Sequence, residues 1–363
     1  SMEQGDAGFT HVHEVVQGLV RLGYAVQLMK PSYRGMRPSV AQRLREIARI
    51  WLAARRLMGK RGINALYVRQ HPLSFPVTIL AHRLGVPVIL EINGTPDELR
   101  VSWPKLKPLV PLLRAGCLAE TRLAAGVVAV TPELASEAKR QSGSPDRVIT
   151  LSNAANTDTM RPLRREELAE TLDKYGLTDG RYVAFVGALA KWQGVDTMLE
   201  AAKHPIWPRG IDLVVCGSGV EASKIQHAGI CQENVRYLGR VPYCDVPGIV
   251  GGSLAGLVPK VDRDRCLKGL SPLKLYEYMA CGKPVIASSL AGLSDVVSEG
   301  NCGILVAPED PEDLASAVRR IAENPEQAKS MGTRGRKLAE ERYSWSTQAR
   351  RLDSFIRVLI AGP

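Results

Sequence analysis

Short apolar segments alternate with longer amphipathic segments along most of this chain. The second half contains six short apolar runs, at residues 182–187, 211–216, 235–238, 254–258, 284–288 and 303–306. The stretches between them have the length and the apolar spacing of helices. Strands that alternate with helices in this way are typical of a parallel sheet covered on both faces.

The first half follows the same pattern. We predict its strands at residues 24–29, 65–68, 87–90, 126–131 and 147–151 and its main helices at 11–22, 37–62 and 132–141. Three amphipathic segments follow residue 310. The periodicity therefore indicates two α/β domains, and a chain of 363 residues is long enough for both.

Composition narrows the class of protein. Hydrophobic residues make up 45% of the chain, which is enough for two cores. The seven cysteines are scattered, without a Cys-x-x-Cys pair or metal-ligand spacing, so we expect a reduced, cytoplasmic chain without structural zinc. We find neither a signal peptide nor an apolar run near ~18 residues, so the sequence predicts no membrane span.

The net charge of +11 bears on partners rather than on the fold. It suits a nucleoside diphosphate or an anionic membrane surface. Only 5% of the residues are aromatic, and we find no nucleic-acid-binding motif, so we expect no nucleic-acid partner.

The segment 269–284 is rich in signals for a short helix followed by a strand. Ser271 is a suitable N-cap and Pro272 a suitable first-turn residue, which predicts a helix over roughly 272–281. Gly282 suits the left-handed position that ends a helix.

Two charged residues lie on one face of this helix. Lys274 and Glu277 are three positions apart. A lysine near the N-terminus opposes the helix dipole unless an anion also binds there, which suggests a phosphate site. The alternative is a surface lysine that pairs with Glu277.

The stretch Ser-Pro-Leu-Lys-Leu-Tyr-Glu-Tyr-Met-Ala, residues 271–280, resembles the signature helix of retaining GT-B glycosyltransferases of family 4. The resemblance implies two Rossmann-like domains that face each other across a cleft. It also implies that Glu277 holds the ribose hydroxyls of a nucleotide-sugar. The family usually has a second glutamate, which touches the donor sugar, at the position of Gly269.

A second segment, 186–196, is similar to the family's diphosphate-binding stretch. The family has an arginine where this chain has Ala188 and a lysine where it has Gln193. We therefore expect Lys191 and Lys274 to supply the positive charge. Gly239–Tyr243 follows a strand, as the family's base-binding loop does. The expected donor-binding residues are Gly8, Gly187, Gln193, Gly217, Arg240, Val241, Ser271, Pro272, Leu273 and Glu277.

The first domain carries polar residues near the ends of its predicted strands. In open parallel sheets, ligands bind beyond the carboxyl ends of the strands. His71 is expected to bind the donor sugar or relay a proton, with a structural role in its loop as the alternative. Gly8 opens a turn that the resemblance places near the donor phosphates. The expected acceptor-binding residues are His11, Glu91, Asn93 and Glu98.

The resemblance covers almost the whole chain and sets the expected domain limits. Residues 1–157 form an acceptor-binding domain, 158–343 a nucleotide-sugar-binding domain, and 344–363 a helix that crosses back to the first. The expected function is retaining transfer of a sugar from a nucleoside diphosphate sugar, a UDP-sugar first among them, to a hydroxyl of a glycan, a lipid-linked acceptor or a small molecule. It implies no metal and no other cofactor. A catalytically weakened nucleotide- or glycan-binding homologue is the alternative.

The last expectation concerns a membrane surface. The helix at 37–62 is basic and amphipathic, and Trp103 follows in the same domain among leucines, lysines and prolines. Such a helix either lies on an anionic leaflet or packs on its own sheet with its arginines in solvent. Both alternatives stay open, and the first would place the protein peripherally at the inner membrane face.

Overall fold

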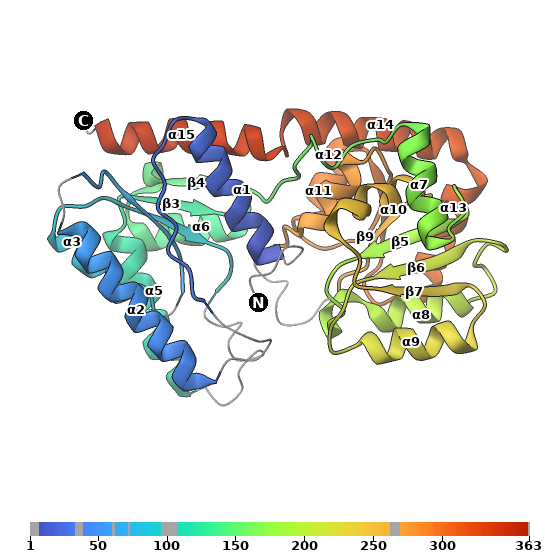
Figure 1. Ribbon diagram of the computed structural model, residues 1–363, viewed down its shortest axis with the longest axis horizontal. Coiled ribbons are helices and arrows are strands. Elements are labelled where there is room, and N and C mark those ends of the chain that lie inside the picture. The colour runs from blue at the N-terminus through green and yellow to red at the C-terminus, as the bar shows by residue number, and fades with distance from the viewer. Residues whose placement is uncertain are drawn as a thin grey trace. The chain divides into compact units, whose positions relative to one another are not determined.

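The structure is a computed structural model, and it describes residues 7–32, 39–59, 62–71, 73–95, 108–261 and 269–361. The chain divides into two compact units. The described residues from Gly8 to Ser152 and from Gln348 onward form the first unit, and Asn153–Thr347 form the second. Each unit is an α/β domain built on its own parallel sheet (Figure 1), which confirms the predicted fold class.

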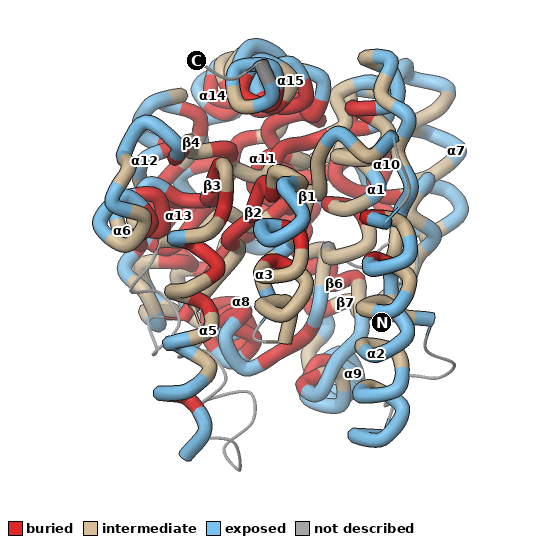
Figure 2. Tube along the Cα trace, turned by 90° about the vertical axis from the view of Figure 1, so that its left-hand side faces the viewer, coloured by how far each residue is buried: buried red, intermediate tan, exposed pale blue. Residues whose placement is uncertain are grey.

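The sheet of the first unit has the order β1-β2-β3-β4, and all its strands are parallel. Strand β2, from Val88 to Ile92, is buried along its whole length, as its apolar sequence requires (Figure 2). The other strands are β1 (Leu66–Arg69), β3 (Gly126–Ala129) and β4 (Val148–Thr150), and the helices are α1 (Ala7–Arg21), α2 (Val40–Met58), α3 (Phe75–Arg83), α5 (Val110–Leu123) and α6 (Pro132–Ser142), with a 3-10 turn at Pro145–Arg147.

The strand predicted at residues 24–29 is wrong. Tyr24 and Val26 pack against the core beside α15, and Met29 packs against the cluster under α2. Tyr24 and Val26 are therefore inward, whereas Leu28 is 46% exposed. The segment nevertheless joins no sheet in the described structure, because side-chain burial does not by itself create a ladder of backbone hydrogen bonds.

The sheet of the second unit has the order β10-β9-β8-β5-β6-β7, again with every pair parallel. The chain order runs outward from β5 in one direction and then from β8 in the other, which is the doubly wound arrangement. The strands are β5 (Tyr182–Val186), β6 (Asp212–Cys216), β7 (Val235–Gly239), β8 (Gly256–Val258), β9 (Val285–Ser288) and β10 (Gly303–Val306).

Alternate residues of these strands enter different cores. Val183 and Phe185 pack with α8, α9 and α13 on one face, whereas Tyr182 and Ala184 pack on the opposite face with α7 and α10. Period-two alternation thus buries both faces of the sheet. The helices of this unit are α7 (Arg165–Tyr175), α8 (Val195–Lys203), α9 (Ala222–Cys231), α10 (Val246–Gly251), α11 (Leu273–Ala280), α12 (Leu293–Gly300), α13 (Pro311–Glu323) and α14 (Pro325–Glu341), with 3-10 turns at Lys191–Gln193 and Tyr243–Asp245.

The last helix, α15, runs from Trp345 to Ala361 and joins the first unit from Gln348 onward. Leu352, Phe355 and Ile356 share a buried cluster with residues of α1 and of the first sheet. A side chain at Gly126 would collide with Phe355 and with the end of this helix. The apolar stripe of α15 is therefore part of the first unit's core.

Helix α2 is shorter than the predicted 37–62. Ser39 caps it through a capping box with Gln42. Ala54 and Met58 are buried, whereas Leu44 is 55% exposed. No helix in the described part of the chain is both long and apolar enough to cross a bilayer.

Candidate functional site

Glycine turns join the carboxyl ends of β5, β6 and β7. The Gly187 N–H donates to the Cys216 carbonyl at 2.9 Å, and the Gly217 N–H donates to the Gly239 carbonyl at 2.7 Å. Gly187 and Gly217 have φ values of +147° and +137°, and a Cβ on Gly217 would lie 1.9 Å from the Gly187 oxygen. Only glycine allows backbone segments to approach this closely.

Lys274 reaches this edge of the sheet from the first turn of α11. Its side chain is buried, with Nζ 3.5 Å from the centre of the Phe185 ring and donating to Gln193 Oε1 at 3.3 Å. A Cβ on Gly187 would lie 2.8 Å from that Nζ. Lys274 therefore lies inside the turn after β5, and the surface alternative considered from the sequence is wrong.

The pKa of Lys274 is held well below its ordinary value. Burial is the main cause, and the charge of Lys260 adds to it, while Glu277 acts in the opposite direction. A buried ammonium that is also repelled by a second lysine is electrostatically unfavourable. An anion bound beside it would remove that penalty.

Lys260 is a charged residue that the sequence analysis did not assign to the site. It follows β8, and its side chain is buried. The Pro259 carbonyl packs against Gly194, and the Val261 N–H donates to the Trp192 carbonyl at 3.3 Å, so the chain around Lys260 lies on the turn that holds Gln193. Its position at the end of a predicted strand was the signal that could have identified it.

Two cations expected in the donor site lie at the surface. Lys191 is the exposed first residue of the turn Lys191–Gln193, and Arg240 is exposed after β7. Val241, next to Arg240, packs partly against the cores of this unit. The structure therefore brings Gly187, Gln193 and Lys274 together, whereas Lys191 remains in solvent.

Glu277 lies one turn beyond Lys274 on α11. Its Oε1 accepts a hydrogen bond of 2.8 Å from the Tyr243 hydroxyl. Tyr243 begins the 3-10 turn that follows the expected base-binding loop. This bond joins the loop after β7 to the helix that carries Lys274.

The predicted N-cap of α11 is wrong. The helix starts at Leu273, with Pro272 in the cap position, and no side chain caps it. The Ser271 hydroxyl instead accepts the Asn153 N–H at 3.0 Å and contacts the Tyr276 hydroxyl at 2.9 Å. This long-range contact competes with the local cap and ties the start of the helix to the first residue of the unit.

In the first unit, Glu91 is the centre of a buried polar cluster at the end of β2. Its Oε2 accepts a 2.5 Å hydrogen bond from the Tyr67 hydroxyl, and its Oε1 accepts one from Asn93. His11 Nε2 lies 2.9 Å from Oε1, and Arg69 Nε lies 3.9 Å from it. Three of the expected acceptor residues, His11, Glu91 and Asn93, are thus in contact.

The charge of Glu91 is stabilised by this cluster. Burial raises the pKa of the carboxyl, but His11, Arg69 and Tyr67 together outweigh burial and lower it to about 2. Glu91 is only 2% exposed. Its oxygens are therefore buried, and Glu91 orients His11 and Asn93 through its contacts with them. Glu98 lies outside the described residues, as does Trp103.

His71 follows β1 at the surface of the same unit. Its Nδ1 accepts the Leu73 N–H at 3.2 Å, which places the proton of the neutral ring on Nε2. The atoms packed around the ring, and then the charge of Arg43, lower its pKa. Gly8, expected in a loop, lies instead in the first turn of α1, because that helix begins at Ala7 rather than at His11.

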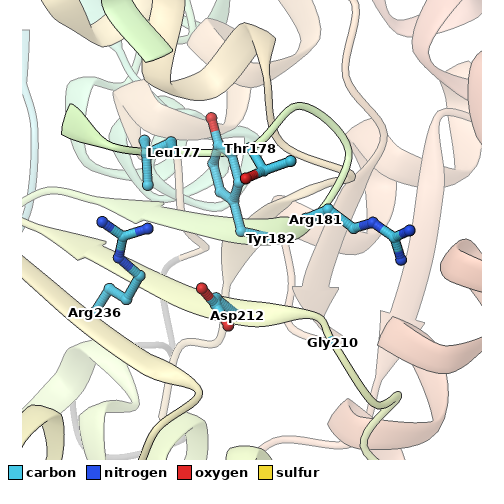
Figure 3. Close-up of a pocket in the computed structure, with 7 residues that line it drawn as sticks. All are labelled: Leu177, Thr178, Arg181, Tyr182, Gly210, Asp212 and Arg236. Carbon is cyan, nitrogen blue, oxygen red and sulfur yellow. The ribbon is translucent and has the colours of Figure 1, made fainter. Parts of the chain in front are cut away.

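A surface hollow of about 330 Å³ lies elsewhere, at the amino ends of β5 and β6 (Figure 3). Arg181, Tyr182, Asp212 and Arg236 line it. Ligands of doubly wound sheets bind at the opposite edge. This hollow is therefore not the candidate site. Among the described residues, no three side chains of the metal-binding types His, Cys, Asp and Glu come together.

The two parallel-sheet units, with glycine turns and a buried lysine at the carboxyl edge of the second, define the class of two-domain Rossmann-like proteins. Residues 180–324 match the family model described as "Glycosyl transferases group 1", and residues 8–159 match "Glycosyltransferase Family 4". The chain belongs to this family and is a glycosyltransferase, which confirms the resemblance noted in the sequence.

Named relatives and solved structures agree with this assignment. The α-D-kanosaminyltransferase of Streptomyces kanamyceticus is 26% identical over 323 residues, which cover 85% of this chain and 81% of the relative. Sucrose-phosphate synthase from Thermosynechococcus elongatus has a TM-score of 0.75 at 19% identity, covering 97% and 93% of the two chains. HepE from Anabaena in complex with UDP-glucose has a TM-score of 0.67 at 16% identity, covering 87% and 83%. These structures show the GT-B fold.

Proposed function

We propose that this glycosyltransferase takes its sugar from a nucleoside diphosphate sugar and transfers it to an acceptor hydroxyl with retention of anomeric configuration. The observation that supports the donor class is Lys274, a buried lysine whose Nζ lies against Gly187 at the carboxyl edge of the sheet and is repelled by the charge of Lys260. Structures of HepE, which share the fold, contain UDP and UDP-glucose, so a UDP-sugar is the first donor to test.

The proposed chemistry is separation of charge at the donor. As the bond to the sugar breaks, negative charge accumulates on the departing diphosphate. Lys274, with Lys260 beside it, stabilises that charge. Glu277, held by Tyr243, accepts hydrogen bonds from the ribose. Lys191, exposed in the neighbouring turn, is a further cation for the diphosphate.

The first unit supplies the acceptor side of the proposal. His71, neutral near pH 7 with its proton on Nε2, binds the donor sugar or relays a proton. His11 and Asn93, oriented by Glu91, contact the acceptor. The acceptor itself is a hydroxyl of a glycan, a lipid-linked sugar or a small molecule. No cofactor beyond the co-substrate is part of this proposal.

A nucleotide screen followed by turnover tests this function. UDP is expected to raise the thermal midpoint more than NAD does, and a UDP-sugar is expected to be slowly hydrolysed without an acceptor. Glu277→Ala should raise donor KM or abolish turnover, whereas Tyr243→Phe, which removes only a supporting hydrogen bond, should act more weakly. Unchanged UDP affinity and turnover in Glu277→Ala would overturn the ribose assignment.

A second candidate is a catalytically weakened homologue that binds a nucleotide or a glycan. It is favoured by the departures from the family pattern at Ala188, Gln193 and Gly269. Tight UDP binding without hydrolysis, and without transfer to any acceptor offered, would select this candidate. Hydrolysis that disappears in Glu277→Ala would exclude it.

A peripheral contact with an anionic membrane is proposed for α2. Leu44 and Leu52 are 55% and 56% exposed, and Arg45, Arg55 and Arg56 are exposed on the same helix. Exposed leucines can enter the apolar part of an anionic leaflet while neighbouring arginines bind its head groups.

A sedimentation experiment tests this contact. The protein should sediment with vesicles of anionic lipid at low salt. The variant Arg55→Glu/Arg56→Glu should lose this binding, and the matched pair Arg319→Glu/Arg320→Glu on α13 should keep it; equal losses would refute the contact.

A further inference from the structure

The carboxyl group of Glu120 is buried in the first unit and takes no part in the sites described above. Glu120 lies on α5 and is 1% exposed. Its Oε1 accepts a 3.0 Å hydrogen bond from the Thr78 hydroxyl of α3 and lies 2.8 Å from Ser74 Oγ. Its Oε2 is buried and has no hydrogen-bond partner among the described residues.

The hydrogen bonds around Ser74 require more protons than its hydroxyl can supply. Ser74 Oγ accepts the His71 N–H at 3.0 Å and lies 2.6 Å from the His71 carbonyl and 2.8 Å from Glu120 Oε1. The hydroxyl has one proton, and the carbonyl and an ionised carboxylate are both acceptors. If Glu120 carries a proton on Oε1, it donates to Ser74, and Ser74 donates to His71. Every short contact then has a donor.

The surroundings of Glu120 also favour its protonated form. Burial raises its pKa to about 7, against the lowering effect of its polar neighbours Ser74, Thr78 and Gln70. The thiol of Cys117, one turn earlier on α5, is kept neutral because burial raises its pKa to about 12. On the neighbouring turn the titratable group is His71, with Arg43 of α2 facing it. No ion pair reaches Glu120 in the part of the chain that the structure describes.

We propose that Glu120 is a positioning residue whose protonated carboxyl fixes Ser74 and, through it, the backbone and the ring of His71. The connection is short. Ser74 bonds both the N–H and the carbonyl of His71, and the N–H of Leu73, the residue before Ser74, donates to the ring nitrogen. The inference deepens the proposed function, since it rests on the role given there to His71.

Ionisation of Glu120 should release Ser74 and His71 from this arrangement. Without its proton, the carboxylate and the His71 carbonyl compete for the single proton of Ser74, and one 2.6–2.8 Å contact joins two acceptors. Ser74 then holds the backbone of His71 less firmly, and the His71 ring loses its fixed orientation. Turnover should therefore fall as the pH rises through the pKa of Glu120, whereas donor binding in the second unit stays unchanged.

The first experiment detects the proton without using activity. Infrared spectra of the whole protein at pH 6 should contain a protonated carboxyl band that disappears at pH 8.5. The band should be absent from Glu120→Gln and present in the matched control Glu137→Gln on α6. Absence of the band in the wild-type protein, or its persistence in Glu120→Gln, would overturn the proposal.

The second experiment measures positioning. Glu120→Gln, whose amide also donates a proton, should keep near wild-type kcat and lose the decline of kcat above pH 7. Glu120→Ala should lower kcat by on the order of tenfold to a hundredfold at unchanged donor KM. A pH profile of Glu120→Gln equal to that of Glu137→Gln would overturn the positioning role.

The variant His71→Ala separates this inference from the proposed function. Wild-type turnover in His71→Ala would overturn the role proposed for His71 and, with it, the positioning role of Glu120. The infrared band would still decide independently whether Glu120 is protonated.

Discussion

Lys274 carries its ammonium group in an unfavourable, buried environment. Its ammonium lies against the Phe185 ring and fills the space that a side chain at Gly187 would need, and the charge of Lys260 opposes it. A cation over an aromatic ring recovers part of the desolvation penalty, but not all of it. An anion bound beside Lys274 would offset this cost. The free protein is therefore less stable because of a charge that lies where the donor diphosphate is proposed to bind.

Replacing this cation should affect activity and stability in opposite directions. Lys274→Met should lower turnover by on the order of a hundredfold or more, because a charge that stabilises the leaving group is lost. It should raise the thermal midpoint of the free protein, because a buried charge is removed. The matched control is Lys283→Met, whose pKa is also lowered by burial and which follows the opposite end of α11. Equal losses of turnover in both variants would contradict a role specific to Lys274.

Glu91 should make the stability of the first unit sensitive to acid. Its pKa is about 2 in the folded chain and 4.5 in the unfolded chain, so its contribution is complete above pH 4.5 and is lost as the pH falls toward 2. The wild-type protein should lose about 1.4 kcal/mol per pH unit in this window relative to Glu91→Gln.

Urea unfolding between pH 7 and 3 measures this difference. Tyr67→Phe, which keeps the carboxylate and removes one hydrogen bond, should retain most of the acid dependence. If the gap between the wild-type protein and Glu91→Gln were constant with pH, Glu91 would not be the ionised centre of the cluster.

At the scale of elements, the turns after β5 and β6 depend on close backbone contact. Gly217→Ala would place a methyl group 1.9 Å from the Gly187 oxygen, in addition to the strain of φ +137°. Gly180→Ala is the matched control, since Gly180 also has a positive φ, +68°, but faces open space. The control should cost about 1 kcal/mol, as expected for the backbone strain alone.

Gly217→Ala should cost several times as much and should also weaken UDP binding, because the turn that carries Gly187 and faces Lys274 must move. Urea unfolding and UDP thermal shifts of both variants provide the measurement. Similar values for the two variants would show that the turns tolerate a side chain.

At the scale of the whole molecule, the C-terminal helix α15 belongs to the first unit from Gln348 onward. Phe355 contributes a buried ring to that unit's core, whereas Val358 on the same helix is 73% exposed. Phe355→Ala should therefore destabilise the first unit by about 3–5 kcal/mol, and Val358→Ala should change it little. Calorimetry that resolves the two units should show the shift in the transition of the first. A shift confined to the second unit would contradict the assignment of α15.

Local pattern was sufficient for the architecture and for the family. The apolar runs predicted all the strands of both sheets within a few residues, because a buried parallel strand needs continuous apolar side chains. Gly282 was correctly predicted to be left-handed, with φ +71°, since few other residues adopt that conformation. The signature at 271–280 identified the glycosyltransferase family because it is a contiguous string of residues.

Contacts between distant segments were decided only by the tertiary structure. Ser271 bonds Asn153 rather than capping its own helix, Lys260 comes beside Lys274 through the packing of β8, and Glu120 of α5 bonds Ser74, which precedes α3. The sequence carries no local signal for such pairs, because each partner's residue type is compatible with many neighbours. Burial then changes their chemistry, lowering the pKa of a lysine and raising that of a glutamate, because desolvation depends on what surrounds a charge rather than on its place in the chain.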